Sequence, residues 1–238
     1  MRKPFTWKPK SPRRQGWRLR VWQIAQWFFV GIVLLWTLDA LILVSARWID
    51  PPTTAVQMQR RLQAWIHNKP YEKRYKFVPI SQISPNLQHA VVAAEDARFY
   101  QHHGFDLKEI QIAVEDDLDG ERSRGASTLT QQLVKNLLFG TSRSFFRKGA
   151  EASLVPVAEI CLGKQRILEL YLNVVEWGPG VYGAEAASHY HDKTSARKLS
   201  REQAAQLAAV LPAPLKRRPE RMTNYTAIIL TRMQQMGW

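Results

Sequence analysis

The longest apolar run of the chain extends from about residue 22 to residue 44 and contains one charged residue, Asp39. As a helix, a run of this length can cross a hydrocarbon core of ~30 Å. Tryptophans suited to the two membrane interfaces lie within and just after it: Trp22, Trp27, Trp36 and Trp48. We therefore predict one transmembrane helix, placed at residues 21–46.

The alternative interpretation of this segment is a cleaved signal peptide. The small residues in Val44-Ser45-Ala46 would suit a cleavage site. However, the apolar run is longer than the ~7–15 residues typical of a signal peptide, which favours the anchor.

Beyond the anchor, apolar residues recur at helical spacing in several short segments. Leu87, Ala90, Val91 and Ala94 form one stripe and predict a buried helix over residues 87–94. Helices are also predicted after Thr53 or Thr54, over residues 106–118 and from Ser200 to just before Pro212. Residues 71–80, rich in Tyr, Phe and Val, predict a short extended piece. The pattern therefore indicates a mainly α fold with few strands.

The net charge of +14 is unevenly distributed along the chain. Residues 1–20 carry eight basic residues and no acidic one, which predicts a cytoplasmic N-terminus and places the residues after about 46 outside the cytoplasm. Residues 122–166 carry eight basic residues against Glu151 and Glu159. A basic cleft in this region would suit an anionic substrate such as a pyrophosphate. The charge would also suit nucleic acid, but no nucleic-acid-binding module is visible, so we expect no such partner.

Glu95 and Asp96 directly follow the predicted buried helix. A carboxylate in that position is expected to be partly desolvated, which raises its pKa and makes it a better general base. The alternative is a solvent-exposed acidic pair at a helix end.

A second polar block runs through residues 124–136. Gly125 permits a tight turn, and Ser127 or Thr128 can cap a following helix, leaving its first backbone N–H groups free for an anion. Leu129, Leu133 and Leu137 form the apolar face of this helix. The opposite face carries amides and a cation: Thr128, Gln131, Gln132 and Lys135. An ordinary amphipathic helix with a capped start is the alternative.

A third block places Arg143, Arg147 and Glu151 on one helical face, with Lys148 beside them. Taken alone, such a block is also typical of a solvent-exposed ladder of ion pairs.

These three blocks, in this order, resemble the family 51 glycosyltransferases, the peptidoglycan polymerases found alone or fused to penicillin-binding transpeptidases. The resemblance covers about residues 75–215 and rests on five motifs without internal gaps. They are met at Glu95, Asp96, Phe99, His102 and Gly104; from Gly125 to Asn136; at Arg147, Lys148 and Glu151; at Lys164, Ile167, Leu168, Glu169, Tyr171, Leu172 and Asn173; and at Gly180, Tyr182, Gly183, Glu185, Ala186 and Ala187. Two departures are His191, where the family usually has an aromatic residue, and Pro156, which is expected to kink a helix.

The resemblance implies a lysozyme-like helical glycosyltransferase domain with a smaller membrane-proximal lobe. It predicts four segments: a basic tail (1–20), the anchor (21–46), a membrane-proximal linker or helix (47–74) and the glycosyltransferase domain (75–238). No segment resembles a transpeptidase, so a monofunctional enzyme is expected. The location implied is the bacterial inner membrane, with a single pass and a periplasmic catalytic domain.

The activity implied is polymerisation of lipid II into glycan strands, with inversion at the anomeric carbon and release of undecaprenyl diphosphate. By resemblance, Glu95 deprotonates the acceptor hydroxyl and Glu151 assists departure of the donor pyrophosphate, directly or through a bound cation. Substrate-binding roles are implied for Asp96, Phe99, Gly125, Ser127, Thr128, Gln131, Gln132, Lys135, Arg143, Arg147 and Lys148. The partners expected are lipid II, the growing lipid-linked chain, the membrane and proteins of cell-wall synthesis or division.

No cofactor is required by this mechanism. The resemblance suggests that a divalent cation, Mg²⁺ or Mn²⁺, can assist, although no metal-ligand set of recognisable spacing is visible in the sequence. Two other functions remain open at this point. A lysozyme-like muramidase would also use two carboxylates in a helical cleft, and a non-catalytic membrane-anchored scaffold would use only the basic surface.

Overall fold

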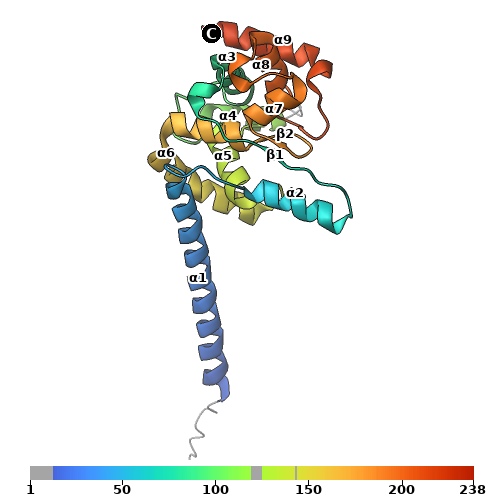
Figure 1. Cartoon of the computed structure of the whole chain (residues 1–238). Helices are drawn as coiled ribbons and strands as arrows, with labels where there is room; N and C mark the ends of the chain where they lie inside the picture. The colour runs from blue at the N-terminus through green and yellow to red at the C-terminus, as the bar shows by residue number, and fades with distance from the viewer. Residues whose placement is uncertain (1–12, 119–124, 143) are drawn as a thin grey trace, which may run out of the picture. The chain divides into compact units, whose positions relative to one another are not determined.

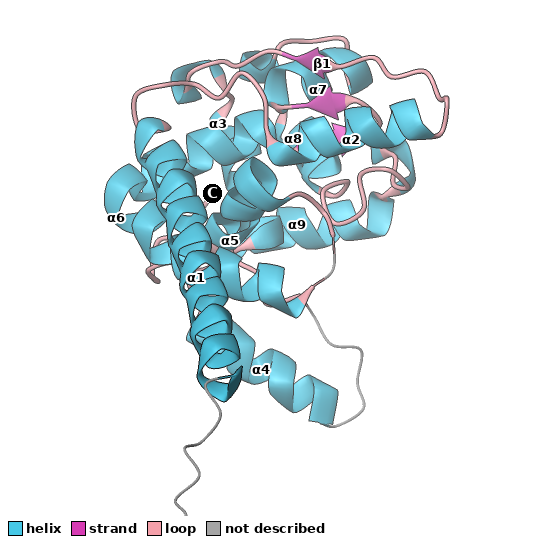
Figure 2. Ribbon diagram, turned by 90° about the horizontal axis from the view of Figure 1, so that it is seen from below, coloured by secondary structure: helices cyan, strands magenta, loops and turns pink. Residues whose placement is uncertain are grey.

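The computed structural model describes residues 13–118, 125–142 and 144–238, and they are mainly helical, as predicted (Figure 2). The chain divides into two compact units, residues 1–41 and 42–238. The finer predicted division at residues 47–74 and 75–238 stays a prediction.

The first unit consists of most of helix α1 (Arg13–Ser45). An apolar stretch, Trp17–Ser45, is long enough to cross a membrane. Its large side chains are widely exposed, among them Trp22, Trp27 and Leu35. Such an apolar, exposed helix is compatible with a single-pass membrane anchor.

The second unit is built from short helices around one long one. Figure 1 shows α8 (Arg201–Ala208) and α9 (Thr223–Gln235) beside α3 (Pro85–Glu95) at one end of this unit, and α2 (Ala55–Ile66) at the other. Between them lie α4 (Leu107–Leu118), α5 (Leu129–Val134), α6 (Phe145–Val174) and α7 (Ala184–His191). The core is formed where α5 packs on α6 and where α3 packs on α8 and α9.

The strands form one small sheet in the order β1-β3-β2. β1 (Arg74–Tyr75) pairs in parallel with β3 (Val181–Tyr182), which pairs antiparallel with β2 (Glu176–Gly178). The predicted extended piece at residues 71–80 is therefore confirmed in its middle. Trp177 and Tyr182 are fully buried and join the sheet to the helical core.

Helix starts follow the predicted capping residues. Thr54 accepts a hydrogen bond from the backbone of Gln57 at the start of α2. Thr128 and Ser200 open α5 and α8, each with a glutamine completing a reciprocal capping box. α5 ends after six residues, and the chain continues as a π-helical turn, Lys135–Phe139. Lys135 is therefore the first residue of a widened turn.

Pro156 lies within α6. The non-helical backbone recorded inside that helix is at Gly163, with φ 71° and ψ 164°. The kink expected at Pro156 stays a prediction. The positive φ at Gly163 interrupts the helix at a second place and is accessible to glycine at little cost.

The fourth sequence motif, on α6, fixes the segment that leads into α3. Asn173 accepts a hydrogen bond from the backbone nitrogen of Val78 at 2.9 Å and donates to its carbonyl at 2.9 Å. Glu169 accepts from the backbone nitrogen of Ile80 at 2.7 Å. These bonds tie residues 78–80 to the long helix and so set where α3 begins.

Gly183 occupies a position that an L-residue would fill only with strain. Its φ is 83°, and an added Cβ would lie 2.4 Å from the carbonyl oxygen of Asn173. We expect Gly183→Ala to lower the free energy of unfolding by ~1–3 kcal/mol, because sparsely populated backbone regions cost about that much. Thermal unfolding of the purified protein in detergent measures this. The control is Gly149→Ala on α6, where nothing lies within 4 Å and alanine should be neutral or stabilising. Equal stability of the two variants would contradict the expectation.

Candidate active site

Glu95 is the last residue of α3 and points into a cleft. Its Oε2 accepts a hydrogen bond from Gln132 Nε2 of α5 at 2.8 Å. Burial raises the pKa of Glu95, while the Gln132 bond and the charges of Lys135 and Arg217 oppose that rise. The side chain is thus a desolvated carboxylate with its charged form partly supported, as expected for a general base.

The cleft beside Glu95 has a volume of about 680 Å³. One wall comes from the predicted motifs and includes Gly125, Ser127, Thr128 and Gln132. The opposite wall comes from the C-terminal part of the chain and presents Arg217, Tyr225 and Arg232. The latter three are held by backbone carbonyls: Arg217 donates to Ala209 at 2.9 Å, Tyr225 to Ala94 at 3.4 Å and Arg232 to Ala93 at 3.3 Å.

This second wall was not predicted from the sequence. Arg217, Tyr225 and Arg232 belong to none of the five motifs. Tyr225 and Arg232 reach the cleft because α9 packs against α3 and α8, and Arg217 lies in the segment that joins α8 to α9. No local spacing in the sequence indicates that packing.

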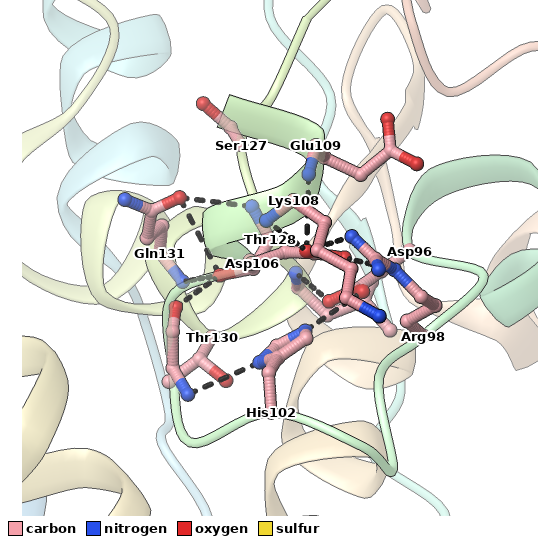
Figure 3. A network of polar contacts seen from close by, with 12 residues as sticks. Asp96, Arg98, His102, Asp106, Lys108, Glu109, Ser127, Thr128, Thr130 and Gln131 are labelled. Atoms are coloured by element: carbon pink, nitrogen blue, oxygen red, sulfur yellow. Dashed lines mark hydrogen bonds and ion pairs between the residues drawn. The ribbon is translucent and has the colours of Figure 1, made fainter. Parts of the chain in front are cut away.

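Asp96 joins α3 to the start of α5 (Figure 3). Its Oδ2 accepts a hydrogen bond from the backbone nitrogen of Leu129 at 2.9 Å, and its Oδ1 lies 2.9 Å from His102 Nε2. Burial raises the pKa of Asp96, and these two bonds lower it. The first backbone N–H group of α5 thus binds the protein's own Asp96 carboxylate, which ties α5 to α3. The substrate-binding role of Asp96 stays a prediction.

Three other residues predicted to bind substrate are also engaged inside the protein. Thr128 donates to the carbonyl of Gly104 at 2.6 Å, and Gln131 Oε1 accepts from the Thr128 backbone at 2.9 Å. Phe99 is fully buried, and the Lys164 ammonium lies 4.5 Å from its ring centroid. Their predicted contacts with substrate stay predictions. Ser127, by contrast, is exposed and its side chain points away from this network (Figure 3).

Within the described ranges, Asp96, His102 and Asp106 form the one recorded group that could offer ligands to a metal ion. The residues do not fit that use. The His102 Nδ1 accepts from the Gly104 backbone at 3.2 Å, so Nε2 carries the proton toward Asp96 and no ring lone pair is free. The Arg98 guanidinium already neutralises Asp106, with Nε 2.9 Å from Oδ2. We derive no catalytic step from a metal at this position.

A second cluster surrounds Glu151 near the start of α6. Glu151 is 2 % exposed. Its Oε2 accepts from Arg147 Nη1 at 2.6 Å and its Oε1 from Lys148 Nζ at 2.7 Å. The predicted shared face of Arg147 and Glu151 is confirmed, whereas Arg143 lies outside the described residues. The Nε of Arg147 is buried and has no hydrogen-bond partner among the described residues.

Lys135 lies within electrostatic reach of both carboxylates. Burial lowers its pKa, and the charges of Glu151 and Glu95 raise it. Across the described part of the chain no ion pair is recorded for it. The site therefore brings a largely desolvated cation within electrostatic reach of two carboxylates, Glu95 and Glu151.

The family model described as transglycosylase matches residues 60–234 of the chain. A biosynthetic peptidoglycan transglycosylase of Pseudomonas putida is 46% identical over 215 residues, covering 89% of this chain and 88% of that protein. The protein of that name from Pseudomonas aeruginosa is 44% identical over 207 residues, covering 86% of this chain and 89% of its own length. In Pseudomonas syringae it is 40% identical over 222 residues, covering 92% and 91%.

Proposed function

The chain belongs to the transglycosylase family and is a peptidoglycan glycosyltransferase of cell-wall synthesis, and from this premise we propose how its residues carry out the reaction. Its fold is the lysozyme-like one of that family. Its substrates are lipid II and the growing glycan chain. The observation that carries the proposal is the pairing of a desolvated carboxylate in a cleft, Glu95, with a second carboxylate, Glu151, that holds two cations.

Glu95 is the general base. It takes the proton of the acceptor's sugar 4-hydroxyl as that oxygen forms a bond to the donor's anomeric carbon. The bond between this carbon and the donor pyrophosphate breaks in the same displacement, so configuration inverts and undecaprenyl diphosphate leaves with the bonding electron pair. The proton on Glu95 then passes to solvent. A raised pKa suits this transfer, because a carboxylate of higher pKa is a stronger base and accepts the hydroxyl proton more readily in the transition state.

The donor pyrophosphate lies on the Glu151 side. Lys135, Arg147 and Lys148 neutralise charge that grows on the leaving group, and we assign Arg143 to the same task from its place in the motif. Two cations already bind Glu151 at hydrogen-bonding distance, so its main task is to hold Arg147 and Lys148 in position. A pyrophosphate is a good leaving group, so charge stabilisation suffices on this side.

The acceptor sugar occupies the cleft between Glu95 and the C-terminal wall. That space is next to Glu95 and is bordered by Ser127 and Gln132 on one side and by Arg217 and Tyr225 on the other. Polar groups on both walls can hydrogen-bond sugar hydroxyls.

The enzyme is anchored in the inner membrane by α1, with its catalytic unit on the periplasmic side. Exposed apolar side chains on the second unit support contact with lipid as well. Leu62, Trp65 and Ile66 of α2 are all exposed, Trp65 by 75%. Phe145 is 97% exposed. Both substrates are carried on a lipid, so an active site next to the bilayer suits them.

Topology gives a direct test of this location. A reporter that works only in the cytoplasm should be active when fused before Trp22 and silent when fused after Trp238, because the basic residues of positions 1–20 stay inside. The reverse pattern would contradict the orientation. Recovery of a soluble protein that starts near Arg47 would instead indicate signal cleavage.

The activity itself is tested by incubating the purified full-length protein in detergent with labelled lipid II. Long glycan strands and released undecaprenyl diphosphate are expected. Preformed glycan incubated in parallel should remain intact. Soluble fragments from that glycan would indicate a muramidase, and no turnover of either substrate would indicate a scaffold.

A further inference from the structure

Tyr171 reaches the general base through one intervening side chain. It lies on α6, in the fourth sequence motif, and is fully buried. Its hydroxyl donates to Gln132 Oε1 at 3.0 Å, and Gln132 Nε2 donates to Glu95 Oε2 at 2.8 Å. The three side chains form a continuous chain of hydrogen bonds that ends on the reacting carboxylate.

We propose that Tyr171 is a positioning residue: its hydroxyl holds the Gln132 amide with the nitrogen toward Glu95, and so controls the pH at which this base becomes active. The inference rests on the proposed role of Glu95. A glutamine amide has a donor end and an acceptor end of nearly equal size, so its orientation is decided by its partners. A hydroxyl that must donate to one end leaves only the donor end for the carboxylate.

The environment keeps Tyr171 a donor. Burial raises its pKa well above the ordinary value, and the charges of Glu95 and Asp96 raise it further, so the phenol stays protonated over the working range. The Gln132 nitrogen also donates to the Ser127 carbonyl, at a longer distance of 3.4 Å. The orientation of the amide therefore depends mainly on Tyr171 and Glu95.

Several charged groups face Glu95 from the elements packed around it. Lys135, in the turn after α5, and Arg217, between α8 and α9, lower its pKa, whereas neighbouring Asp96 raises it. Tyr225 and Arg232 of α9 bind the last carbonyls of α3 and line the same cleft. None of these groups contacts the amide oxygen of Gln132 in the hydrogen bonds described, so none can replace Tyr171 in orienting it.

Loss of the Tyr171 hydroxyl is expected to raise the pKa of Glu95. Without it the amide can rotate and place its oxygen toward Glu95, which disfavours the ionised carboxylate and favours the protonated acid. The folded-enzyme pKa of Glu95 then rises. Since a general base acts in its ionised form, the acid limb of the kcat/KM profile moves to higher pH.

The test is the pH profile of lipid II polymerisation by full-length Tyr171→Phe in detergent. We expect the acid limb to move up by about 0.5–1 pH unit, from the typical net strength of one hydrogen bond. At pH values above both limbs the variant should recover most of the parent activity. The matched control is Tyr182→Phe, which removes another fully buried hydroxyl whose recorded contacts, Tyr71 and Glu176, lie away from Glu95. Its acid limb should not move.

A double-mutant comparison isolates the path. In a Gln132→Leu background, adding Tyr171→Phe should change the position of the acid limb by less than about 0.2 pH unit, because the Tyr171 hydroxyl then has no amide to orient.

An unshifted acid limb in Tyr171→Phe, or a loss of activity equal at every pH, would overturn the inference. Glu95→Gln, assayed in parallel, separates the two proposals. If the Tyr171 inference is overturned but Glu95→Gln is inactive, Glu95 remains the base and only the role of Tyr171 fails. If Glu95→Gln is active, the proposed role of Glu95 fails as well.

Discussion

Glu95→Gln is expected to reduce lipid II polymerisation by roughly 10²–10⁴-fold, the range credited to general acid–base catalysis. The amide preserves the size of the side chain but cannot accept a proton at neutral pH. The oxygen of the new amide can still accept the hydrogen bond from Gln132 Nε2, so folding and donor binding should be nearly unchanged. The measurement is single-turnover and steady-state rates with labelled lipid II, together with the thermal unfolding midpoint.

The control for this substitution is Glu202→Gln. Glu202 belongs to the first turn of α8, is exposed and does not line the cleft. Its replacement should change the rate by less than about threefold. Turnover by Glu95→Gln within a few-fold of the parent would contradict the assignment of Glu95 as the base. Equal losses in both variants would point to a general effect of removing negative charge.

The sequence predicted the elements that depend on local pattern. The helix before Glu95 follows from a stripe of apolar residues, and Leu87, Ala90 and Val91 are indeed fully buried. The starts of α2 and α8 follow from Thr54 and Ser200, because a capping side chain acts within its own turn. Such features need no knowledge of distant contacts.

The break recorded in α6 at Gly163 was not predicted, for a related reason. Proline has a known effect on an isolated helix, so Pro156 was the expected kink. Gly163 carries no such signal, since glycine permits a positive φ without requiring it. Whether it adopts one depends on the direction in which the second half of the helix must run to reach the core.

The sequence predicted which residues form the candidate site better than it predicted what each of them does. The motifs place Glu95, Gln132, Lys135 and Glu151 in one region, and the structure brings them together. The same motifs also contain Thr128 and Gln131, which the sequence does not separate from substrate-binding residues. Their hydrogen bonds to Gly104 and to each other stabilise the start of α5, and their predicted contacts with substrate stay predictions. Gly104 must be glycine there, with φ 94° and an added Cβ 2.4 Å from Val155.

The contribution of the C-terminal helix could not be predicted from spacing. Arg217 and Arg232 are separated from Glu95 by more than one hundred residues of sequence and reach it only through packing of α9 on α3. Tyr171 is an intermediate case. Its motif was recognised in the sequence, but its hydrogen-bond partner Gln132 is 39 residues away. Neither motif predicts a hydrogen bond between the two residues.

Lys135→Ala is expected to reduce kcat/KM for lipid II by roughly 10- to 150-fold. A charge-assisted hydrogen bond is worth ~1.5–3 kcal/mol, and ~1.4 kcal/mol corresponds to one decade. The leaving pyrophosphate gains negative charge as its bond to carbon breaks, so a cation placed there helps the transition state more than the bound donor. Both kcat and donor affinity should therefore fall, with the larger part of the loss in kcat.

Removal of Lys135 also changes the pKa of Glu95, and the assay can be arranged to exclude this effect. The charge of Lys135 lowers the pKa of Glu95, so its removal raises that pKa and moves the acid limb of the profile upward. A rate compared at one neutral pH would then combine two losses. Rates should be compared at a pH above the acid limb of each variant, where Glu95 is ionised in both. The loss that persists there belongs to the pyrophosphate.

The matched control is Lys198→Ala, which removes an exposed lysine from a short 3₁₀ turn far from the two carboxylates in sequence. A surface charge of that kind should change the rate by less than about threefold. Assays in neutral detergent remove anionic lipid, so a general attraction of cations to a membrane surface cannot contribute. If Lys135 serves only as surface charge, both variants will lose little and to a similar extent. A large loss confined to Lys135, undiminished by moderate salt because the ammonium is desolvated, would instead place the donor pyrophosphate between Glu95 and Glu151.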